Sequence, residues 1–232
     1  MPSEGASRPV VLILAAGLGE RFRQAGGTHD KLSAPLGGQR VRDHVLAAAQ
    51  ASGLPWHVVE RSHTTHLAEQ GMGASIATGV AATAEAAGWL ILPADLPLVQ
   101  PDSLRRVAEA LAHHTVVAPW VQGQRGHPVG FGAMCREALL ALSGDQGAKR
   151  VMQAHAPWRL ELDDIGCILD VDTPEALAEA DRLDALVHAM HSVAKIVEPA
   201  SVASPTELRS ILSSGHNGLR GATLRQLGVV NQ

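Results

Sequence analysis

The sequence predicts an α/β protein built on a doubly wound, mostly parallel sheet. Apolar runs typical of strands buried on both faces alternate with segments of helical periodicity. Hydrophobic residues make up 46% of the 232 residues and charged residues only 18%, so an extensive core can form. The chain contains no Tyr, 2 Phe and 4 Trp, and we therefore expect that core to be aliphatic.

The first element is an apolar strand, VVLILAA, at residues 10–16. It is too short to span a bilayer and leads into a loop rich in Gly and charge at residues 17–38. The next elements are expected in this order: a helix at 41–52, a strand at 57–60, a helix at 73–87, a strand at 89–92, a helix at 103–113 and a strand at 115–119.

A last long helix is predicted to begin at Pro174, with Thr173 as its N-cap, and to run toward His188. We place a domain at residues 8–188 and a C-terminal extension of unknown role at residues 189–232. Within the extension, SPTE at residues 204–207 is a capping box that predicts one short helix.

Charge and cysteine content exclude several classes of protein. The net charge of −4 argues against a nucleic-acid-binding protein that relies on basicity. Cys135 and Cys167 lie far apart and form neither a disulfide framework nor a zinc motif, which suits a cytoplasmic protein; we expect both to be core thiols. Neither a nucleic acid nor a membrane is expected as a partner.

The glycine loop after the first strand, LAAGLGERF, is a candidate phosphate-binding loop. Gly17 and Gly19 allow close backbone approach to an anion, and Arg21 and Lys31 can neutralise a triphosphate. The loop is not a Walker motif, because the chain contains no Gly-Lys-Ser/Thr. It is not a dinucleotide fingerprint either, because Phe22 stands where the third glycine is needed, which disfavours a nicotinamide dehydrogenase.

Carboxylates follow two further apolar segments. Asp95 comes directly after the strand at residues 89–92 and could hold Mg²⁺, or it could cap the helix that starts near Pro101. Asp170 and Asp172 would face the same side of a strand, and either could be a second metal ligand. The alternative for Asp172 is that it caps the last helix.

Further motifs follow the glycine loop, so that the chain carries, in order between residues 10 and 183, LAAGLGERF, DKL, GMGASIATGV, LPADLPLV, GQRGHPVGF, GDQGAK and LDVDTPEAL. By these motifs and their order the chain resembles the MobA-like nucleotidyltransferases, and within them the molybdenum cofactor cytidylyltransferases. The resemblance implies a Rossmann-like three-layer sandwich of the nucleotide-diphospho-sugar transferase type. Relatives usually carry Ser or Thr where Gly19 stands, and residues 23–29 lengthen the loop before Lys31.

The resemblance also implies a site, with Mg²⁺ as cofactor. The catalytic residues would be Arg21, Lys31 and Asp95. The nucleotide would be bound by Leu14, Ala15, Ala16, Gly17, Gly19, Lys31, Gly71, Met72 and Ser75. The acceptor would be bound by Arg125, His127, Asp145 and Gly147, with Gly126 and Pro128 in the same loop, and the metal by Asp95, Asp170 and Asp172. For Met72 the alternative is that it only fills a gap under the loop.

The implied reaction transfers CMP from CTP to the molybdopterin cofactor and releases pyrophosphate, with a recipient molybdoenzyme as a further partner. Ala16, where the guanylyl branch carries Gly, favours CTP over GTP. Three alternatives stay open: a GTP-using activity, transfer to another phosphorylated small molecule such as a sugar phosphate, and a non-catalytic cofactor chaperone. We expect the pairs His63/His66 and His113/His114 to be incidental surface residues, because no ligand partners accompany them at metal-binding spacing.

Overall fold

The computed structural model describes residues 7–65 and 71–197, with side chains described to residue 189. The chain divides into two units, Met1–His188 and Ala189–Gln232. The short helix expected near residues 204–207 lies outside the described residues. No helix in the described part of the chain is long and apolar enough to cross a membrane.

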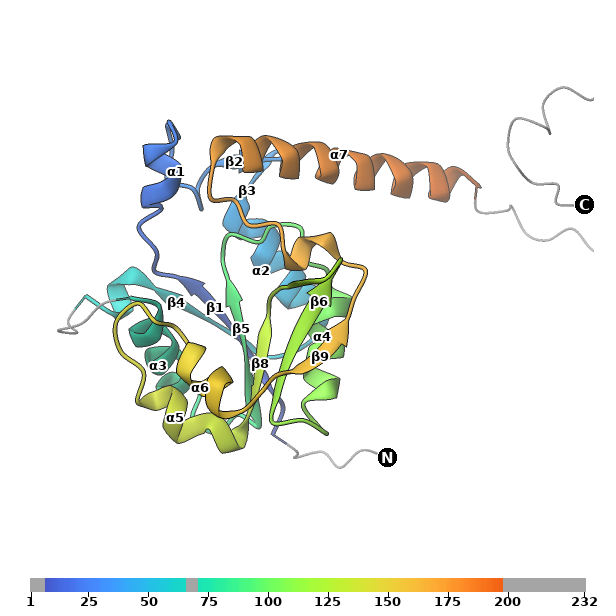
Figure 1. The fold of residues 1–232 in the computed structure, drawn as a ribbon. Helices are drawn as coiled ribbons and strands as arrows, with labels where there is room; N and C mark the ends of the chain where they lie inside the picture. Colours follow the sequence, from blue (N-terminus) through green and yellow to red (C-terminus); the bar gives the residue numbers. More distant parts are fainter. Residues whose placement is uncertain (1–6, 66–70, 198–232) are drawn as a thin grey trace, which may run out of the picture. The chain divides into compact units, whose positions relative to one another are not determined.

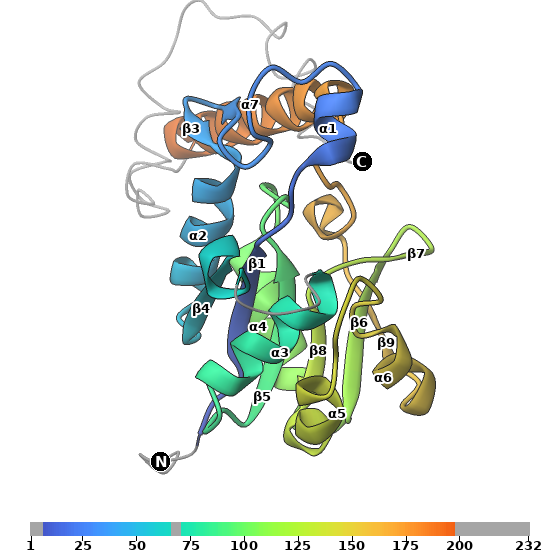
Figure 2. The same ribbon diagram turned by 90° about the vertical axis from the view of Figure 1, so that its left-hand side faces the viewer.

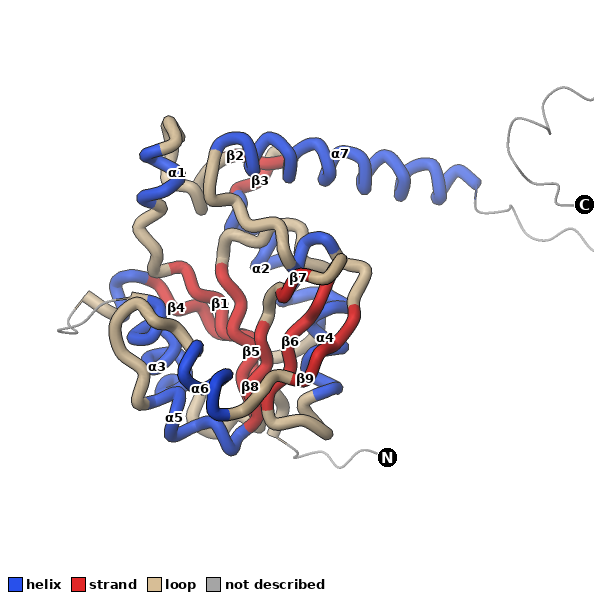
Figure 3. The backbone as a smooth tube through the Cα atoms, viewed as in Figure 1, coloured by secondary structure: helices blue, strands red, loops and turns tan. Residues whose placement is uncertain are grey.

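A seven-stranded mixed sheet forms the centre of the first unit (Figures 1 and 3). Its strand order is β4-β1-β5-β8-β6-β7, and β9 pairs with β6. The strands are β1 (Val10–Ala15), β4 (Trp56–Glu60), β5 (Gly88–Pro93), β6 (Val116–Val121), β7 (Gln124–Arg125), β8 (Val129–Gly132) and β9 (Trp158–Glu161). β1 runs parallel to β4 and β5, and β6 runs parallel to β9, whereas β8 is antiparallel to both of its neighbours. The predicted α/β class with a mostly parallel sheet is confirmed.

Helices cover both faces of the sheet and give three layers. On one face lie α2 (Val41–Ser52) and α4 (Pro101–Ala110); on the other lie α3 (Met72–Ala82), α5 (Arg136–Leu140) and α6 (Lys149–Ala154). Figure 1 shows α3, α5 and α6 to the left of the sheet, and Figure 2 looks onto that side. Because successive strand residues point to opposite faces, Val11 and Ile13 of β1 enter one core and Val10 and Leu12 the other.

The remaining elements are α1 (Glu20–Gln24), the β2–β3 hairpin (Pro35–Leu36 and Gln39–Arg40), the 3-10 turns η1 (Arg61–His63), η2 (Ala133–Cys135) and η3 (Ile165–Cys167), and α7 (Pro174–Val197). η1 follows the carboxyl end of β4, at the sheet edge where β1 ends, whereas η2 follows β8 at the opposite edge. The hairpin is tied to α7 by the Gly37 amide, which donates to Asp181 Oδ1 at 2.8 Å.

Several predicted elements match the structure closely, and others differ in length. α2 has the predicted bounds, and β1, β4, β5 and β6 lie where strands were expected. α3 ends at Ala82 rather than residue 87, because Thr83 leaves the helical conformation; its hydroxyl donates to the Gly79 carbonyl and accepts from Trp89 Nε1. α4 begins two residues early, at Pro101, and α7 continues past His188 to Val197.

Candidate active site

A cleft opens at the sheet edge where the parallel strands β1, β4 and β5 end. Ligands of open α/β sheets bind beyond the carboxyl ends of the strands. Because β8 runs in the opposite direction, the segment before it reaches the same edge. The cleft has a volume of about 940 Å³, within the size range of small-molecule sites.

Most of the predicted site residues line this cleft. They are Leu14, Ala16, Gly17, Gly19, Arg21, Lys31, Gly71, Met72, Ser75, Asp95, Arg125, His127, Asp145, Asp170 and Asp172. Two others lie elsewhere. Ala15 packs against the core on the α2 side of the sheet, and Gly147 sits beside Met72, behind the cleft wall.

The glycine loop turns sharply into α1 after β1 ends. Gly19 is the N-cap of α1 and has φ 61°, a left-handed conformation that favours glycine. A Cβ atom on Gly19 would lie 3.3 Å from Lys31 Cγ. The loop therefore runs directly along the aliphatic stem of Lys31, even though the intervening segment is long.

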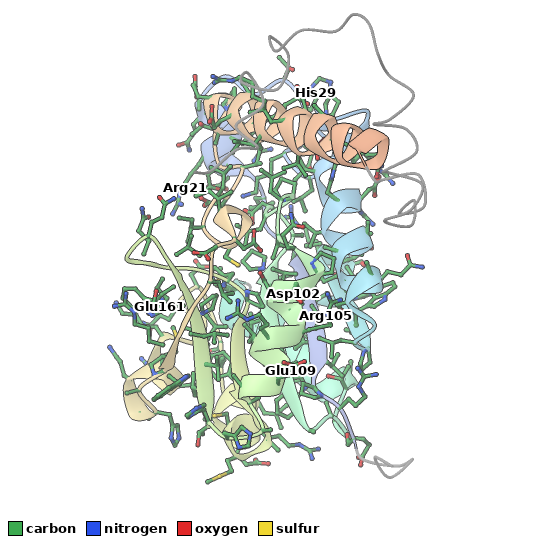
Figure 4. The ribbon with its side chains drawn as sticks, turned by 90° about the vertical axis from the view of Figure 1, so that its right-hand side faces the viewer. Arg21, His29, Asp102, Arg105, Glu109 and Glu161 are labelled. Carbon is green, nitrogen blue, oxygen red and sulfur yellow. The ribbon has the colours of Figure 1, made fainter. Side chains whose placement is uncertain are left out.

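Four charged side chains form one ion-pair cluster, which we call the charged end of the cleft. Lys31 Nζ lies 2.5 Å from Asp95 Oδ2 and 2.6 Å from Asp172 Oδ1. Arg21 Nη1 lies 2.8 Å from Asp172 Oδ2. The Lys31, Asp95 and Asp172 side chains are 13%, 15% and 23% exposed, whereas that of Arg21 is 82% exposed and is labelled in Figure 4.

The backbone around Asp170 and Asp172 is not the strand that their spacing predicted. These residues lie in an irregular segment between η3 and α7, so that expectation was wrong. The segment is held in place because the Val171 amide donates to the Asp95 carbonyl at 2.9 Å while the Val171 side chain is fully buried. A buried residue flanked by two carboxylates keeps an alternating pattern without a strand, and both carboxylates line the cleft.

Neither Asp95 nor Asp172 serves as a helix cap. The N-cap residue of α4 is Gln100, which makes no side-chain cap bond. At α7 the Ala176 amide donates to Thr173 Oγ1 at 3.2 Å, which leaves Asp172 free to pair with Lys31 and Arg21. The alternatives that Asp95 or Asp172 is only a cap are excluded.

The ion pairs shift the pKa values of their members. Burial lowers the pKa of Lys31, but Asp95 and Asp172 outweigh it and raise the pKa above its ordinary value. Burial raises the pKa of Asp172, but hydrogen bonds from Lys31 and Arg21 lower it overall. Asp170 makes no such pair, and burial together with the charges of Asp172 and Asp95 raises its pKa. The site is thus crowded with negative charge that Lys31 and Arg21 only partly compensate.

The carboxylates suit a divalent cation bound together with phosphates. Asp95 Oδ1 is buried and has no hydrogen-bond partner, although its sister oxygen contacts Lys31. Among the described residues, no group of three or more His, Cys, Asp or Glu side chains is arranged to hold a metal ion. Mg²⁺ binds proteins through one or two carboxylates, with water and substrate phosphates completing its coordination. Asp95 and Asp170 fit that pattern.

The opposite part of the cleft, which we call the β8 end, is formed by Arg125, Gly126 and His127. The His127 amide donates to the Cys167 carbonyl at 2.8 Å, and the residue is partly buried. Burial lowers the pKa of the imidazole and Arg125 adds to that effect, whereas the Ile91 backbone and the charge of Asp95 raise the pKa. The Nδ1 atom is buried and has no hydrogen-bond partner.

The start of α3 forms a third wall of the cleft. Gly71 has φ 140°, and a Cβ atom there would lie 2.3 Å from Asp145 Oδ1. The Ser75 hydroxyl donates to the Gly71 carbonyl at 2.9 Å, and the Gly73 amide donates to the Gly144 carbonyl at 2.8 Å. These contacts hold the 143–147 loop against α3 and bring Asp145 to the cleft. Met72 is 46% exposed there, which favours a surface role over gap filling.

Arg61 and Thr64 are among the residues that line the cleft and that sequence reasoning missed. Both follow the carboxyl end of β4, and the rule that placed the loops after β1 and β5 in the site applied equally to this one. Arg61 is exposed, and Thr64 is buried with its hydroxyl donating to the Arg61 carbonyl at 3.1 Å.

Both cysteines belong to the hydrophobic core. Cys135 and Cys167 are buried, as predicted, and burial raises both pKa values. Cys167 does reach the cleft, and its thiol donates to Asp164 at 3.4 Å. His114 stacks on Trp158 with ring centroids 4.2 Å apart.

Comparison with known proteins identifies relatives of this chain. The sequence profile of the MobA-like NTP transferase domain matches residues 11–158. The purine catabolism protein PucB of Bacillus subtilis (strain 168) is 32% identical over 193 residues, which cover 71% of this chain and 91% of PucB.

Two solved structures share the fold. The manganese complex of Rv0371c from Mycobacterium tuberculosis H37Rv is 22% identical with a TM-score of 0.58, covering 76% of this chain and 99% of Rv0371c. A nucleotidyl transferase from Methanothermobacter thermautotroptrophicus, Mth528, is 21% identical with a TM-score of 0.61. The match covers 81% of this chain and 100% of the Mth528 chain. At these identities the likeness shows the fold alone.

Proposed function

The chain belongs to the MobA-like NTP transferase family, and from that membership we propose that it transfers CMP from CTP to the terminal phosphate of the molybdopterin cofactor, releasing pyrophosphate. The observation that carries the proposal is the charged end of the cleft. It places two cations and two carboxylates beside a glycine loop, and Asp170 lines the same cleft, as the handling of a metal-bound triphosphate requires.

The order of strands supports a linear arrangement of the two substrates. β4 and β1 lie at one side of the sheet, β5 in the middle, and β8 and β6 at the other. We place the nucleoside over the β4 and β1 loops, near Ala16 and Arg61. The triphosphate then lies beside Lys31 and Arg21, and the acceptor lies over the β8 end, with Arg125 and His127.

The reaction is an in-line substitution at the α-phosphorus. An oxygen of the acceptor's phosphate forms a bond to the α-phosphorus as the bond to the bridging α–β oxygen breaks, and that oxygen leaves with pyrophosphate. Lys31 and Arg21 neutralise charge on the leaving group, and Arg125 holds the incoming anion. Both reactants are anions, so positioning and charge neutralisation carry most of the rate enhancement.

Mg²⁺ would be held by Asp95 with Asp170 or Asp172, where it supplies charge neutralisation and orientation at the reacting phosphates. The free Oδ1 atom of Asp95 supports that position. No side-chain nucleophile is required, because the acceptor phosphate is itself the nucleophile.

The base and the acceptor are the finer parts of the proposal. Ala16 lines the cleft beside the loop that would hold the nucleoside, and its methyl group reduces the room that a larger purine would need. The GQRGHPVGF and GDQGAK motifs supply Arg125, His127 and Asp145 to the cleft and support a pterin over a sugar phosphate.

Pyrophosphate release with each of CTP, GTP, ATP and UTP, with and without the molybdopterin cofactor, tests the proposal. We expect release that depends on CTP, the cofactor and Mg²⁺ together. A preference for GTP would contradict the role of Ala16, and release with a sugar phosphate instead of the cofactor would contradict the acceptor. No release with any pair would favour the cofactor chaperone.

A further inference from the structure

The Lys31 side chain would have to move before a metal ion could bind the carboxylates that it contacts, or before Lys31 itself could bind a triphosphate. Its ammonium group touches one oxygen of Asp95 and one of Asp172, at 2.5 and 2.6 Å. Charge-assisted hydrogen bonds of this length are strong, and the side chain is largely buried. Lys31 is therefore paired with the two carboxylates in this structure.

The negative charge of the carboxylates around Lys31 exceeds the positive charge that Lys31 and Arg21 provide. Asp95, Asp170 and Asp172 all line the cleft, whereas Arg21 contributes from an exposed position and reaches only Asp172. Asp95 Oδ1 stays unpartnered. If Lys31 were uncharged, this group of carboxylates would attract any divalent cation strongly, because little else offsets their charge.

We propose that Lys31 is a resident cation that keeps a divalent metal out of the nucleotide-free site, so that the metal enters together with the nucleotide. The inference rests on the metal position given under the proposed function. A triphosphate brings new negative charge to the glycine loop, which gives the ammonium group a second anion to bind. When Lys31 turns toward the phosphates, the carboxylate oxygens that it held become available to the metal.

The glycine loop lies next to the side chain that would move. A Cβ atom on Gly19 would be 3.3 Å from Lys31 Cγ, so the stem of Lys31 runs along a residue that has no side chain. In this proposal, rotation of the terminal torsions of Lys31 carries its ammonium group from the carboxylates toward the phosphates at the glycine loop.

Mn²⁺ binding to the nucleotide-free protein, followed by electron paramagnetic resonance of the free ion, tests the inference. Lys31→Met keeps the length and apolar stem of the side chain and removes its charge. We expect at least tenfold tighter Mn²⁺ binding by Lys31→Met than by the wild type. The matched control is Arg21→Met, which should change the affinity less than threefold because Arg21 is exposed and screened.

The double variant Lys31→Met/Asp95→Asn locates the ion and should lose most of the gain. Circular dichroism confirms that each variant is folded, and Lys31→Gln replaces Lys31→Met if the latter is not. Equal affinity in the wild type and the Lys31 variant would overturn the inference, as would a gain that survives Asp95→Asn. No nucleotide or acceptor is present, so a failed pyrophosphate assay and a failed Mn²⁺ assay are separate results.

Discussion

The charged end and the β8 end of the cleft differ in how their polar groups are satisfied. At the charged end, Lys31 and Arg21 pair with carboxylates at 2.5 to 2.8 Å. At the β8 end, Arg125 is exposed and His127 Nδ1 has no partner. Among residues 7–65 and 71–189, the buried side-chain N and O atoms without a partner are Asp95 Oδ1 and His127 Nδ1, one at each end.

This difference indicates which substrate each end recognises. A buried polar group without a hydrogen-bond partner lowers the stability of a protein by roughly 1–3 kcal/mol. Each of these two atoms is therefore a candidate contact for a ligand. A carboxylate oxygen in an anionic cluster suits a cation, whereas an imidazole nitrogen suits a polar group that can form a hydrogen bond with it. We therefore propose that the charged end binds phosphate and metal and that the β8 end binds the remainder of the acceptor.

The largest effect is expected at the charged end. Asp95→Asn should lower Mg²⁺-dependent turnover by about a thousandfold or more, because it weakens a metal interaction worth several kcal/mol in the transition state. Steady-state pyrophosphate release measures the loss. Asp102→Asn is the control. Asp102 lies on α4, where its carboxylate pairs with Arg105; both residues are labelled in Figure 4. Turnover of Asp95→Asn within tenfold of the wild type would contradict the metal assignment.

A smaller and more selective effect is expected at the β8 end. His127→Leu should raise the KM for the acceptor by about 10- to 100-fold, the cost of one lost hydrogen bond to substrate, while the KM for CTP stays unchanged. His127→Asn places an amide near the position of Nδ1 and should recover part of the loss. A matched rise in both KM values would show that His127 only maintains the structure.

From the left-handed conformation of Gly19 in the glycine loop we expect an effect on the free energy of unfolding. Gly19→Ala should lower the free energy of unfolding by about 1–2 kcal/mol, because an alanine at φ 61° is strained and its Cβ would crowd Lys31. Urea unfolding compares it with Gly17→Ala, where no atom lies within 4 Å of the new Cβ. Equal stability of the two variants would show that the left-handed turn is not required.

The smallest effect is the pH dependence of the ion pairs. The pKa of Asp172 is lowered in the folded state, so its contribution to stability is present above the ordinary value of 3.8 and is lost as the pH falls through the folded-state pKa. The stability difference between the wild type and Asp172→Asn should stay level from pH 5 to pH 8 and shrink by less than about 1 kcal/mol at lower pH. A difference that grows on acidification would contradict the pairing.

Local signals were sufficient for the elements that fix the charged end. β1 and β5 are continuous apolar runs and α2 ends at a glycine, so each could be predicted from its own residues. The β8 end depends on β7, β8 and β9, which are short and carry few strand signals. They exist because they pair with distant strands, as Gly130 does with Leu90 and Arg159 with Ala118, and such pairings leave no local pattern.

The candidate site shows the same limit. Asp170 and Asp172 were correctly expected to reach the cleft with Asp95, but for the wrong reason, since a backbone bond from Val171 to Asp95 replaces the predicted strand. The Lys31 ion pairs join residues separated by 64 and 141 positions. The sequence could predict that Lys31 and the aspartates lie near one crevice, but it could not predict that Lys31 pairs with Asp95 and Asp172.

We propose that the two ends of the cleft hold two substrates, which become one product. Incubation with CTP labelled at the α-phosphate, Mg²⁺ and the molybdopterin cofactor, followed by phosphatase treatment and chromatography, tests this most directly. We predict that the label enters a phosphatase-resistant cytosine dinucleotide, in one-to-one ratio with the pyrophosphate released. Label that remains in CTP, or that appears as free phosphate after phosphatase treatment while the cofactor is unchanged, would contradict the account.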